Sequence, residues 1–217
     1  MAASALVVPL AARSTPSGEP VPAYVRRALA GETRAFNELY QLHRRDVARL
    51  AARLLGPRGD VDDIVQDVFV QVFRSLPNFR GDSRFSTWLH RVTVNVVLMY
   101  LRSQKSRPRL VSDDQAGVEA PTPVASPLDD AASRERLRAL YRILDGVGEK
   151  KRTVFILHDI EGVSATDVGR IVGAPVLTVR TRLFYARREV YAAMATDPML
   201  DSIAAELGFA ESPGDDE

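Results

Sequence analysis

The sequence contains no cysteine among its 217 residues. Disulfide frameworks, thiolate zinc sites and cysteine nucleophiles are therefore excluded, and the composition is compatible with a reducing cytoplasm, where we expect the protein. The apolar stretch Met1–Ala12 lacks a basic flank, contains Pro9 and is shorter than the about 20 apolar residues of a membrane span. We expect residues 1–20 to form a flexible extension, with a signal peptide as the alternative, and we expect no membrane insertion.

Histidine is scarce, and the motifs of common enzymes are missing. His43, His90 and His158 are far apart in the chain, and none stands four residues from another. The sequence has neither a Gly-rich phosphate loop nor a nucleophile elbow. We therefore predict that the protein is not an enzyme, and we expect no catalytic residue, no metal site and no cofactor. A helical hydrolase is the alternative that these absences oppose.

Excess charge of one sign is also absent, since the formal net charge is +1. Basic residues are nevertheless unevenly placed, because none follows Arg188 while acids recur from Asp197 to Glu217. Any attraction to DNA is therefore local. Within this acidic tail, the stripe Leu200–Leu207 predicts a short amphipathic helix that either caps a domain or folds back on a basic helix; we favour capping.

Helical periodicity dominates the chain, and no strand pattern competes with it. We expect helices over Thr33–Leu55, from Asp60 to Leu76 and from Phe85 to about Arg102. The apolar side expected for the second helix carries Val61, Ile64, Val65, Val68, Val72 and Phe73. Periodicity vanishes from about residue 104 to 130, where prolines, serines and acids offer too little apolar surface to offset the entropy of ordering. Further helical patterns follow from residue 131. The sequence predicts an all-α protein with two small helical domains joined by a flexible linker.

The segment Ile160–Tyr191 predicts two helices joined by a tight turn. Ser164 and Asp167 can form a capping box at the start of the first helix. Gly173 ends that helix, and Pro175 suits the first turn of the next. This arrangement is a helix-turn-helix, which is typical of DNA-binding proteins.

The second helix of this motif separates into an apolar side and a basic side. The side expected to pack inward carries Val176, Val179, Leu183, Ala186 and Val190. The outward side carries Thr178, Thr181, Tyr185 and Arg188, flanked by Arg182 and Phe184, with Arg180 nearer the buried edge. Arginine can pair with guanine and phosphate, and an aromatic ring can contact a thymine methyl group. The alternative is a merely solvated basic helix, which the capped turn before it opposes.

Several blocks occur in a fixed order along the chain. They are Ala35–Tyr40, Asp62–Phe69, Phe79–Leu89, Arg91 with Asn95, and Thr178–Leu183 with Ala186 and Arg187. Together they resemble the extracytoplasmic-function (ECF, group IV) RNA polymerase sigma factors of the sigma-70 family. Leu177 stands where that family often has glycine, and Phe184-Tyr185 where one residue is commonly His or Arg.

The resemblance implies a function and a domain organisation. The function is that of an ECF-type sigma factor, which binds core RNA polymerase, recognises minus-thirty-five and minus-ten promoter elements, helps to melt DNA and initiates transcription of a specific regulon. The implied segments are an N-terminal extension (1–20), sigma region 2 (21–103), a flexible linker (104–130), a region 4 helix-turn-helix (131–195) and an acidic C-terminal extension (196–217). The implied partners are core RNA polymerase, promoter DNA and an anti-sigma factor.

By this resemblance, an acidic helix docks on the largest polymerase subunit. The residues expected there are Asp60, Asp62, Asp63, Gln66, Asp67 and Gln71. Their carboxylates and amides can pair with basic groups and so set register and encounter rate. Asp60 and Asp62 have an alternative role in complementing the helix dipole, which acts mainly within the first turn. A metal site is disfavoured because no histidine lies at ligand spacing.

The resemblance assigns the melted minus-ten element to the following loop and helix. The residues expected there are Phe79, Arg80, Ser83, Arg84, Trp88, Arg91 and Asn95. Phe79 and the loop would receive a flipped base, Asn95 would bond a base edge, and arginines including Arg84 and Arg102 would hold phosphates. For Trp88 we expect a packing role in the core, with DNA contact at its rim as the alternative, and Gly-Asp-Ser is also ordinary turn chemistry.

The resemblance assigns the duplex minus-thirty-five element to the helix-turn-helix. Arg180, Thr181, Phe184 and Tyr185 match base-contacting positions, with Thr178 beside them, and Arg182 and Arg188 match phosphate contacts. Each of the two DNA-binding domains is expected to bind weakly by itself. Binding of one domain raises the local concentration of the other near its DNA site once polymerase fixes their separation, so we expect poor DNA binding by the free protein. The rival is a dimeric repressor that binds a palindrome without polymerase.

Overall fold

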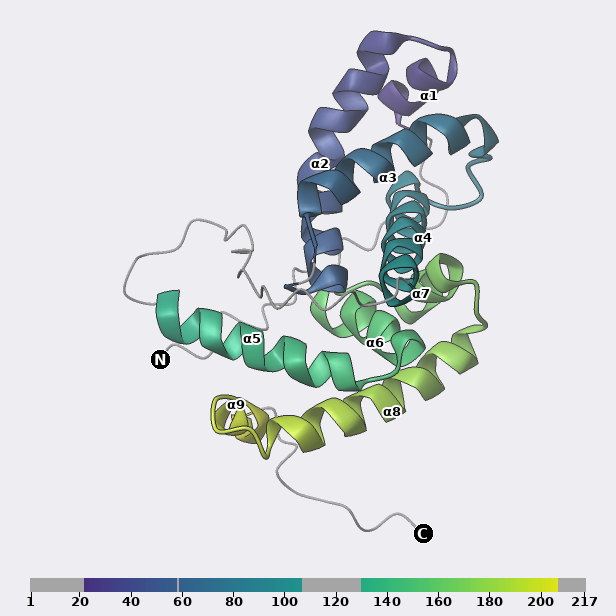
Figure 1. The fold of residues 1–217 in the computed structure, drawn as a ribbon. Coiled ribbons are helices and arrows are strands. Elements are labelled where there is room, and N and C mark those ends of the chain that lie inside the picture. Colours follow the sequence, from purple (N-terminus) through teal and green to yellow (C-terminus); the bar gives the residue numbers. More distant parts are fainter. Residues whose placement is uncertain (1–21, 58, 107–129, 207–217) are drawn as a thin grey trace. The chain divides into compact units, whose positions relative to one another are not determined.

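The computed structural model describes residues 22–57, 59–106 and 130–206 (Figure 1). Every regular element within these ranges is a helix, and the all-α prediction with two helical domains is confirmed. The expected N-terminal extension, nearly all of the expected linker and the end of the acidic tail lie outside the described residues. The helices divide into two compact units, and each is considered separately below.

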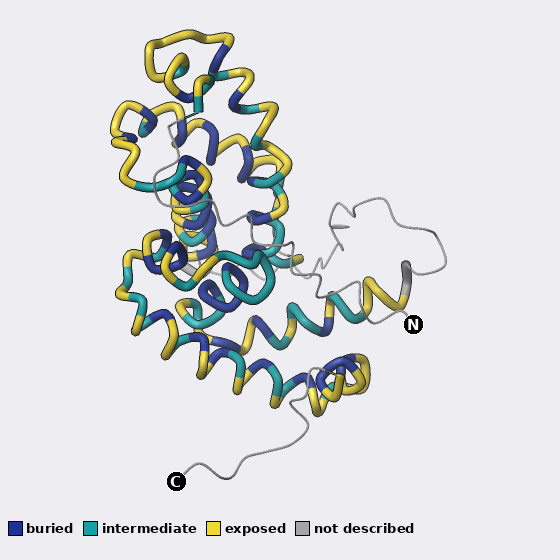
Figure 2. Tube along the Cα trace, turned by 180° about the vertical axis from the view of Figure 1, so that it is seen from behind, coloured by how far each residue is buried: buried dark blue, intermediate teal, exposed yellow. Residues whose placement is uncertain are grey.

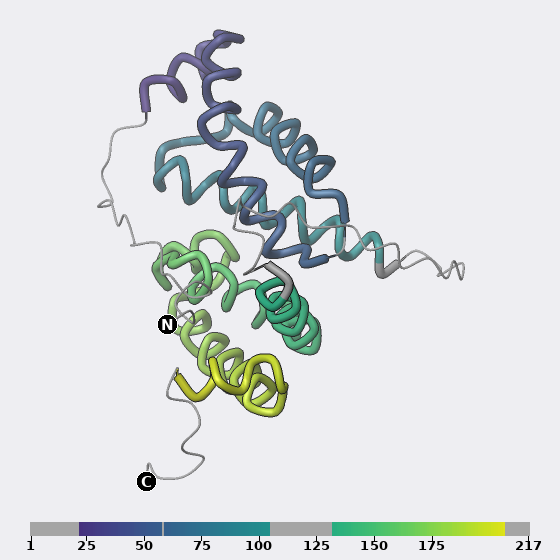
Figure 3. Tube along the Cα trace, turned by 90° about the vertical axis from the view of Figure 1, so that its left-hand side faces the viewer, coloured from purple at the N-terminus to yellow at the C-terminus, as the bar shows by residue number. Residues whose placement is uncertain are grey.

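The first unit contains the helices α1 to α4 and also the segment Thr166–Ala174. Its main elements are α1 (Ala23–Leu29), α2 (Thr33–Leu55), α3 (Val61–Ser75), the short 3₁₀ helix η2 (Leu76–Asn78) and α4 (Phe85–Ser106). Helix α2 packs against α1, α3 and α4, and α3 packs against α4 (Figure 3). The fully buried side chains of Leu39, Leu50 and Ile64 lie in the resulting core.

The second unit contains α5 (Asp130–Gly146), α6 (Glu149–Phe155), the π-helical turn η3 (Ile156–Ile160), α8 (Val176–Met194) and α9 (Asp201–Glu206). Helix α8 is the centre of this unit, because α5, α6 and α9 all pack against it. Buried residues of α9 and of the turn before it, Leu200 and Ile203, close one end of the unit. The predicted short helix in the tail is therefore present and packs on α8.

Helix ends follow from local backbone chemistry. Asp60 is the N-cap of α3, and its carboxylate accepts hydrogen bonds from the backbone N–H groups of Asp62 (2.8 Å) and Asp63 (3.3 Å). Gly173 ends α7 (Ala165–Val172) with φ 65°, a conformation that glycine adopts without strain. Pro175 is the N-cap of α8 and lies just before its first turn.

Three differences from the sequence expectation concern the first unit. Helix α1 was not predicted, because its seven residues show only a single buried side chain, Val25. Helix α4 continues to Ser106, past the predicted end near Arg102, although residues 102–104 are exposed and Leu101 before them is buried. Phe73 was expected on the buried side of α3, and that expectation is wrong because its side chain is 65% exposed.

Candidate functional site

Helix α3 presents a polar and mostly acidic face to solvent. Its buried side carries Ile64, Val65, Val68, Phe69 and Val72. The predicted residues Asp62, Asp63, Gln66, Asp67 and Gln71 are all exposed. Figure 2 shows the general pattern, in which buried and exposed stretches alternate along the helices. Asp60 is exposed as well, and its carboxylate caps the helix. The structure thus brings the predicted set to one helix, with five side chains on its solvent side.

Two apolar residues on this face were missed by sequence reasoning. Val70 and Phe73 are exposed, and they follow Gln66 at helical spacing. The ring of Phe73 packs edge-on against Phe36 of α2, with ring centroids 5.2 Å apart. The helical spacing of Phe73 from Gln66 could have placed it on the solvent side, had the aromatic ring not favoured burial. The acidic face therefore ends in an apolar patch of Val70, Phe73 and Phe36.

The loop before α4 is anchored by aromatic packing. Phe79 is buried, and its ring centroid lies 5.6 Å from that of Phe85 and 5.4 Å from that of Trp88. Trp88 is half-buried and also contacts Phe85, which agrees with the packing role expected for it. In this conformation the Phe79 ring packs in an aromatic cluster with Phe85 and Trp88. The proposed reception of a flipped base by Phe79 stays a prediction.

Some of the polar residues expected to contact the melted strand are exposed to solvent, and others are half-buried. Arg80, Arg91 and Asn95 are exposed, as is Arg102, whereas Ser83 and Arg84 are half-buried. The Ser83 hydroxyl donates to the carbonyl oxygen of Arg84 (3.3 Å).

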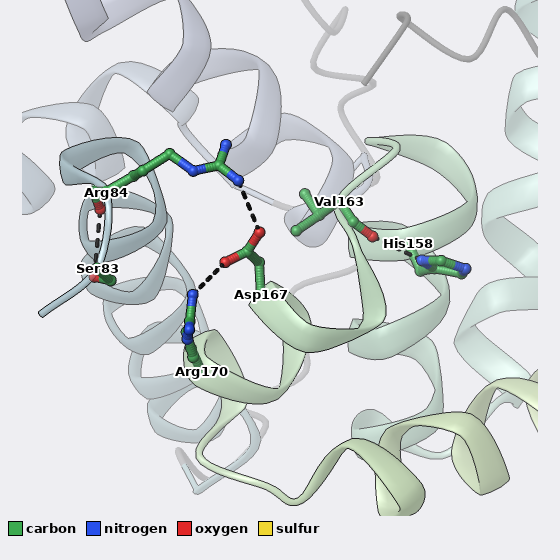
Figure 4. A network of polar contacts seen from close by, with 6 residues as sticks. All are labelled: Ser83, Arg84, His158, Val163, Asp167 and Arg170. Carbon is green, nitrogen blue, oxygen red and sulfur yellow. Dashed lines mark hydrogen bonds and ion pairs between the residues drawn. The ribbon is translucent and has the colours of Figure 1, made fainter. Parts of the chain in front are cut away.

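Within the first unit, the carboxylate of Asp167 accepts hydrogen bonds from two arginines (Figure 4). Arg84 Nη2 lies 3.4 Å from one oxygen, and Arg170 Nη1 lies 3.2 Å from the other. The guanidinium expected to hold a phosphate is thus directed at a carboxylate in this conformation. The capping box of Ser164 and Asp167 stays a prediction.

The histidines are hydrogen-bonded or buried within the fold. Tyr24 Oη lies 2.8 Å from His43 Nε2, and His158 Nδ1 lies 2.7 Å from the carbonyl oxygen of Val163. Burial lowers the pKa of His43 and of His90, because it penalises the charged imidazolium.

In the part of the chain that the structure describes, no three His, Asp or Glu side chains are grouped so as to hold a metal ion. No helix in that part is long and apolar enough to cross a membrane.

Helix α8 presents a basic and aromatic face. Val179, Leu183, Ala186 and Val190 are buried as predicted, and Val176 is half-buried. Arg180, Thr181, Phe184, Tyr185 and Arg188 are exposed, whereas Thr178 and Arg182 are half-buried. Arg180 was expected nearer the buried edge and is instead exposed. The face also carries Leu177, which was not among the predicted site residues and is 75% exposed.

Ion pairs outside this face connect α8 to η3 and to α6. Arg187 donates to both oxygens of Asp159, from Nε (2.9 Å) and from Nη2 (2.6 Å). These hydrogen bonds raise the pKa of Arg187. Asp159 belongs to the π-helical turn η3, so this pair joins η3 to α8. Lys151 of α6 forms a second ion pair, with Glu189 of α8.

Comparisons with known proteins agree with this geometry. The family described as Sigma-70 region 2 matches residues 39–107, and the family described as Sigma-70, region 4 matches residues 137–190. The ECF RNA polymerase sigma-E factor of Escherichia coli (strain K12) is 35% identical over 174 residues, which are 76% of this chain and 90% of that protein. The chain belongs to the ECF RNA polymerase sigma factors.

Other relatives of this sigma factor agree. The sigma-E factor of Haemophilus influenzae is 34% identical over 174 residues, covering 77% of this chain and 92% of that one. Among solved structures, CnrH in complex with the cytosolic domain of CnrY has a TM-score of 0.59 and 27% identity, covering 80% of this chain and 96% of that chain. The sigma factor RpoE of Bartonella quintana, in complex with the anti-sigma factor NepR, has a TM-score of 0.57 at 20% identity, covers 75% of this chain and 98% of that chain, and supports the fold.

The region 4 match bears on the division of this sigma factor. It runs without a break through Thr166–Ala174, the segment whose contacts group it with the first unit. Region 4, as the family match gives it, therefore includes residues of both units.

Proposed function

We propose that this sigma factor binds core RNA polymerase through the solvent face of α3 and directs the enzyme to promoters. In this proposal α4 and the loop before it read the melted minus-ten element, while α8 reads the minus-thirty-five duplex. The proposed segments are those that the sequence predicts, 21–103 for region 2 and 131–195 for region 4, and the family matches at 39–107 and 137–190 support them.

One observation supports this division of work most directly. Helices α3 and α8 each bury an apolar side and expose a side with one dominant charge, acidic on α3 and basic on α8. Carboxylates and amides suit a basic protein surface, and arginines suit the phosphates of DNA. The protein would act by binding and positioning, in the cytoplasm where the polymerase works, and without catalysing a reaction of its own.

We also propose that a protein partner restrains this sigma factor. The structure of CnrH, at 27% identity, contains the cytosolic domain of CnrY. An anti-sigma factor, the kind of partner that the sequence resemblance implies, would cover surfaces that the polymerase needs.

In vitro transcription with purified core polymerase tests the proposal. We expect the full chain to confer initiation at a defined set of start sites, and genome-wide mapping of these sites to reveal shared upstream and minus-ten elements. Absence of binding to core polymerase, or random initiation, would refute the proposal.

A gel-shift assay without polymerase addresses the repressor alternative. The sigma factor proposal expects weak binding to promoter duplex under these conditions, since each DNA reader makes few contacts alone. Tight binding to a palindromic duplex with half-sites about one DNA turn apart would favour the repressor.

A further inference from the structure

Leu177 has the largest exposed fraction among the large apolar side chains that the structure describes, at 75%. It lies in the first turn of α8, on the side opposite the buried residues Val179 and Leu183. Single exposed apolar residues are common on protein surfaces, but Leu177 is accompanied by Phe184, which is 62% exposed. The pair indicates an apolar feature on the outward side of a basic helix.

Leu177 and Phe184 belong to one stripe with Thr181 and Arg188. These residues stand at positions i, i+7, i+4 and i+11 and so line a single side of α8. The Thr181 hydroxyl donates to the carbonyl oxygen of Leu177 (3.0 Å), so its proton is used within the helix. At its N-terminal end the stripe therefore offers apolar surface, with hydrogen-bond donors supplied by neighbouring arginines.

The charges around this stripe indicate what kind of ligand it can bind. The only acid in α8 is Glu189, and its carboxylate is paired with Lys151. Arg180 is exposed beside the stripe, and Arg188 is exposed at its C-terminal end. An apolar surface bordered by cations fits a polyanion that carries small apolar groups. The major groove of DNA is such a surface, because thymine displays a C5-methyl group there.

We propose that Leu177 reads a thymine methyl group in the minus-thirty-five duplex. This inference rests on the proposed function, and it names the base feature that the first turn of α8 recognises. Recognition helices contact base edges with their N-terminal residues, which is where Leu177 stands. Phe184 lies about 10 Å farther along the helix axis, so it contacts a different base pair.

Replacing single thymines by uracil tests the proposal, because uracil lacks only the methyl group and keeps the hydrogen-bonding edge. The holoenzyme of the full chain is first used to identify its promoter. Each thymine of the upstream element is then replaced in turn, and binding is measured for the wild-type and Leu177→Ala proteins. We expect uracil at one base pair to weaken wild-type binding about three- to fivefold, and to have no effect on Leu177→Ala at that position.

Two variants make the result specific. Leu42 on α2 is also an exposed leucine, and Leu42→Ala should retain every uracil effect of the wild type. Phe184→Ala should retain the uracil effect assigned to Leu177. Because Leu177 is exposed, Leu177→Ala should melt at the wild-type temperature, which excludes misfolding as a cause.

The inference is overturned if Leu177→Ala keeps all the uracil effects of the wild type, or if uracil weakens wild-type binding at no position. Either result would leave the proposed function intact. Failure of the proposed function is seen earlier and separately, as a wild-type holoenzyme that selects no promoter.

Discussion

Helices α3 and α8 are both amphipathic, but their exposed sides carry charges of opposite sign. The solvent side of α3 carries carboxylates and amides and ends in the apolar residues Val70 and Phe73. The solvent side of α8 carries arginines and the aromatic pair Phe184 and Tyr185, whose ring centroids lie 5.3 Å apart. The buried side of each helix packs in its own unit, and the exposed side is the one that we propose to select a protein partner on α3 and DNA on α8.

The largest effect is expected when a buried side chain of each helix is truncated. Ile64 of α3 and Leu183 of α8 are both buried, and truncation leaves a cavity in each unit. We expect Ile64→Ala and Leu183→Ala each to lower the free energy of unfolding by about 2–5 kcal/mol. Urea denaturation measures the change. Val70→Ala, on the exposed side of α3, is the control and should change it by less than about 0.5 kcal/mol.

Charge reversal on the exposed sides should separate two functions. We expect Asp67→Lys to weaken binding to core polymerase about tenfold or more, which corresponds to about 1.4 kcal/mol. Arg188→Glu should leave polymerase binding unchanged and weaken promoter binding by a similar factor. Fluorescence anisotropy with core polymerase measures the first, and promoter binding by holoenzyme assembled at saturating core polymerase measures the second. Glu206→Lys on α9 is the matched control, and equal loss of both functions in either variant would contradict the division.

Acid should destabilise the first unit more than the second. Burial lowers the pKa of His43 and His90 below the unfolded value of about 6.5, so the unfolded chain binds protons that the folded chain does not. Stability from these groups is complete above that value and is lost as the pH falls below it, by at most about 1.4 kcal/mol per pH unit for each histidine. Urea denaturation from pH 7 to 5 should show this slope. His43→Gln with His90→Gln should flatten it, and an unchanged slope would assign the effect to other groups.

The smallest effect concerns the ion pair that joins η3 to α8. Asp159→Asn removes the charge but keeps the shape, and because Arg187 is 41% exposed, water screens the loss. We expect the free energy of unfolding to fall by about 1 kcal/mol. Thermal denaturation measures it, and Asp201→Asn on α9 serves as the control. An effect as large as that of Leu183→Ala would show that this pair is more strongly coupled to the core than its exposure indicates.

The helices of both units were predictable because their periodicity and ends are local properties. Helix α2 has the predicted bounds, and Asp60 and Gly173 start and end helices as their chemistry requires. Which side of α8 is buried was also predictable, since Val179, Leu183, Ala186 and Val190 repeat at helical spacing. The contacts that the exposed residues make with polymerase and DNA stay predictions.

The features that sequence reasoning missed depend on packing between elements. Asp159 and Arg187 are 28 residues apart, and the π-helical turn that carries Asp159 leaves no mark in the apolar pattern. Phe73 was assigned to the core because aromatic residues are usually buried, although its position on α3 faces solvent. Leu177 was noted only as a departure from a family pattern, and its exposure became evident from the structure.

The aromatic cluster before α4 provides the chain with a natural spectroscopic reporter. Trp88 is the only tryptophan in the sequence, and its half-buried indole lies against Phe79 and Phe85. Tryptophan emission therefore reports on the first unit alone, while the second unit is silent at that wavelength. Emission and circular dichroism recorded on one unlabelled sample can thus resolve whether the two units melt together or one after the other.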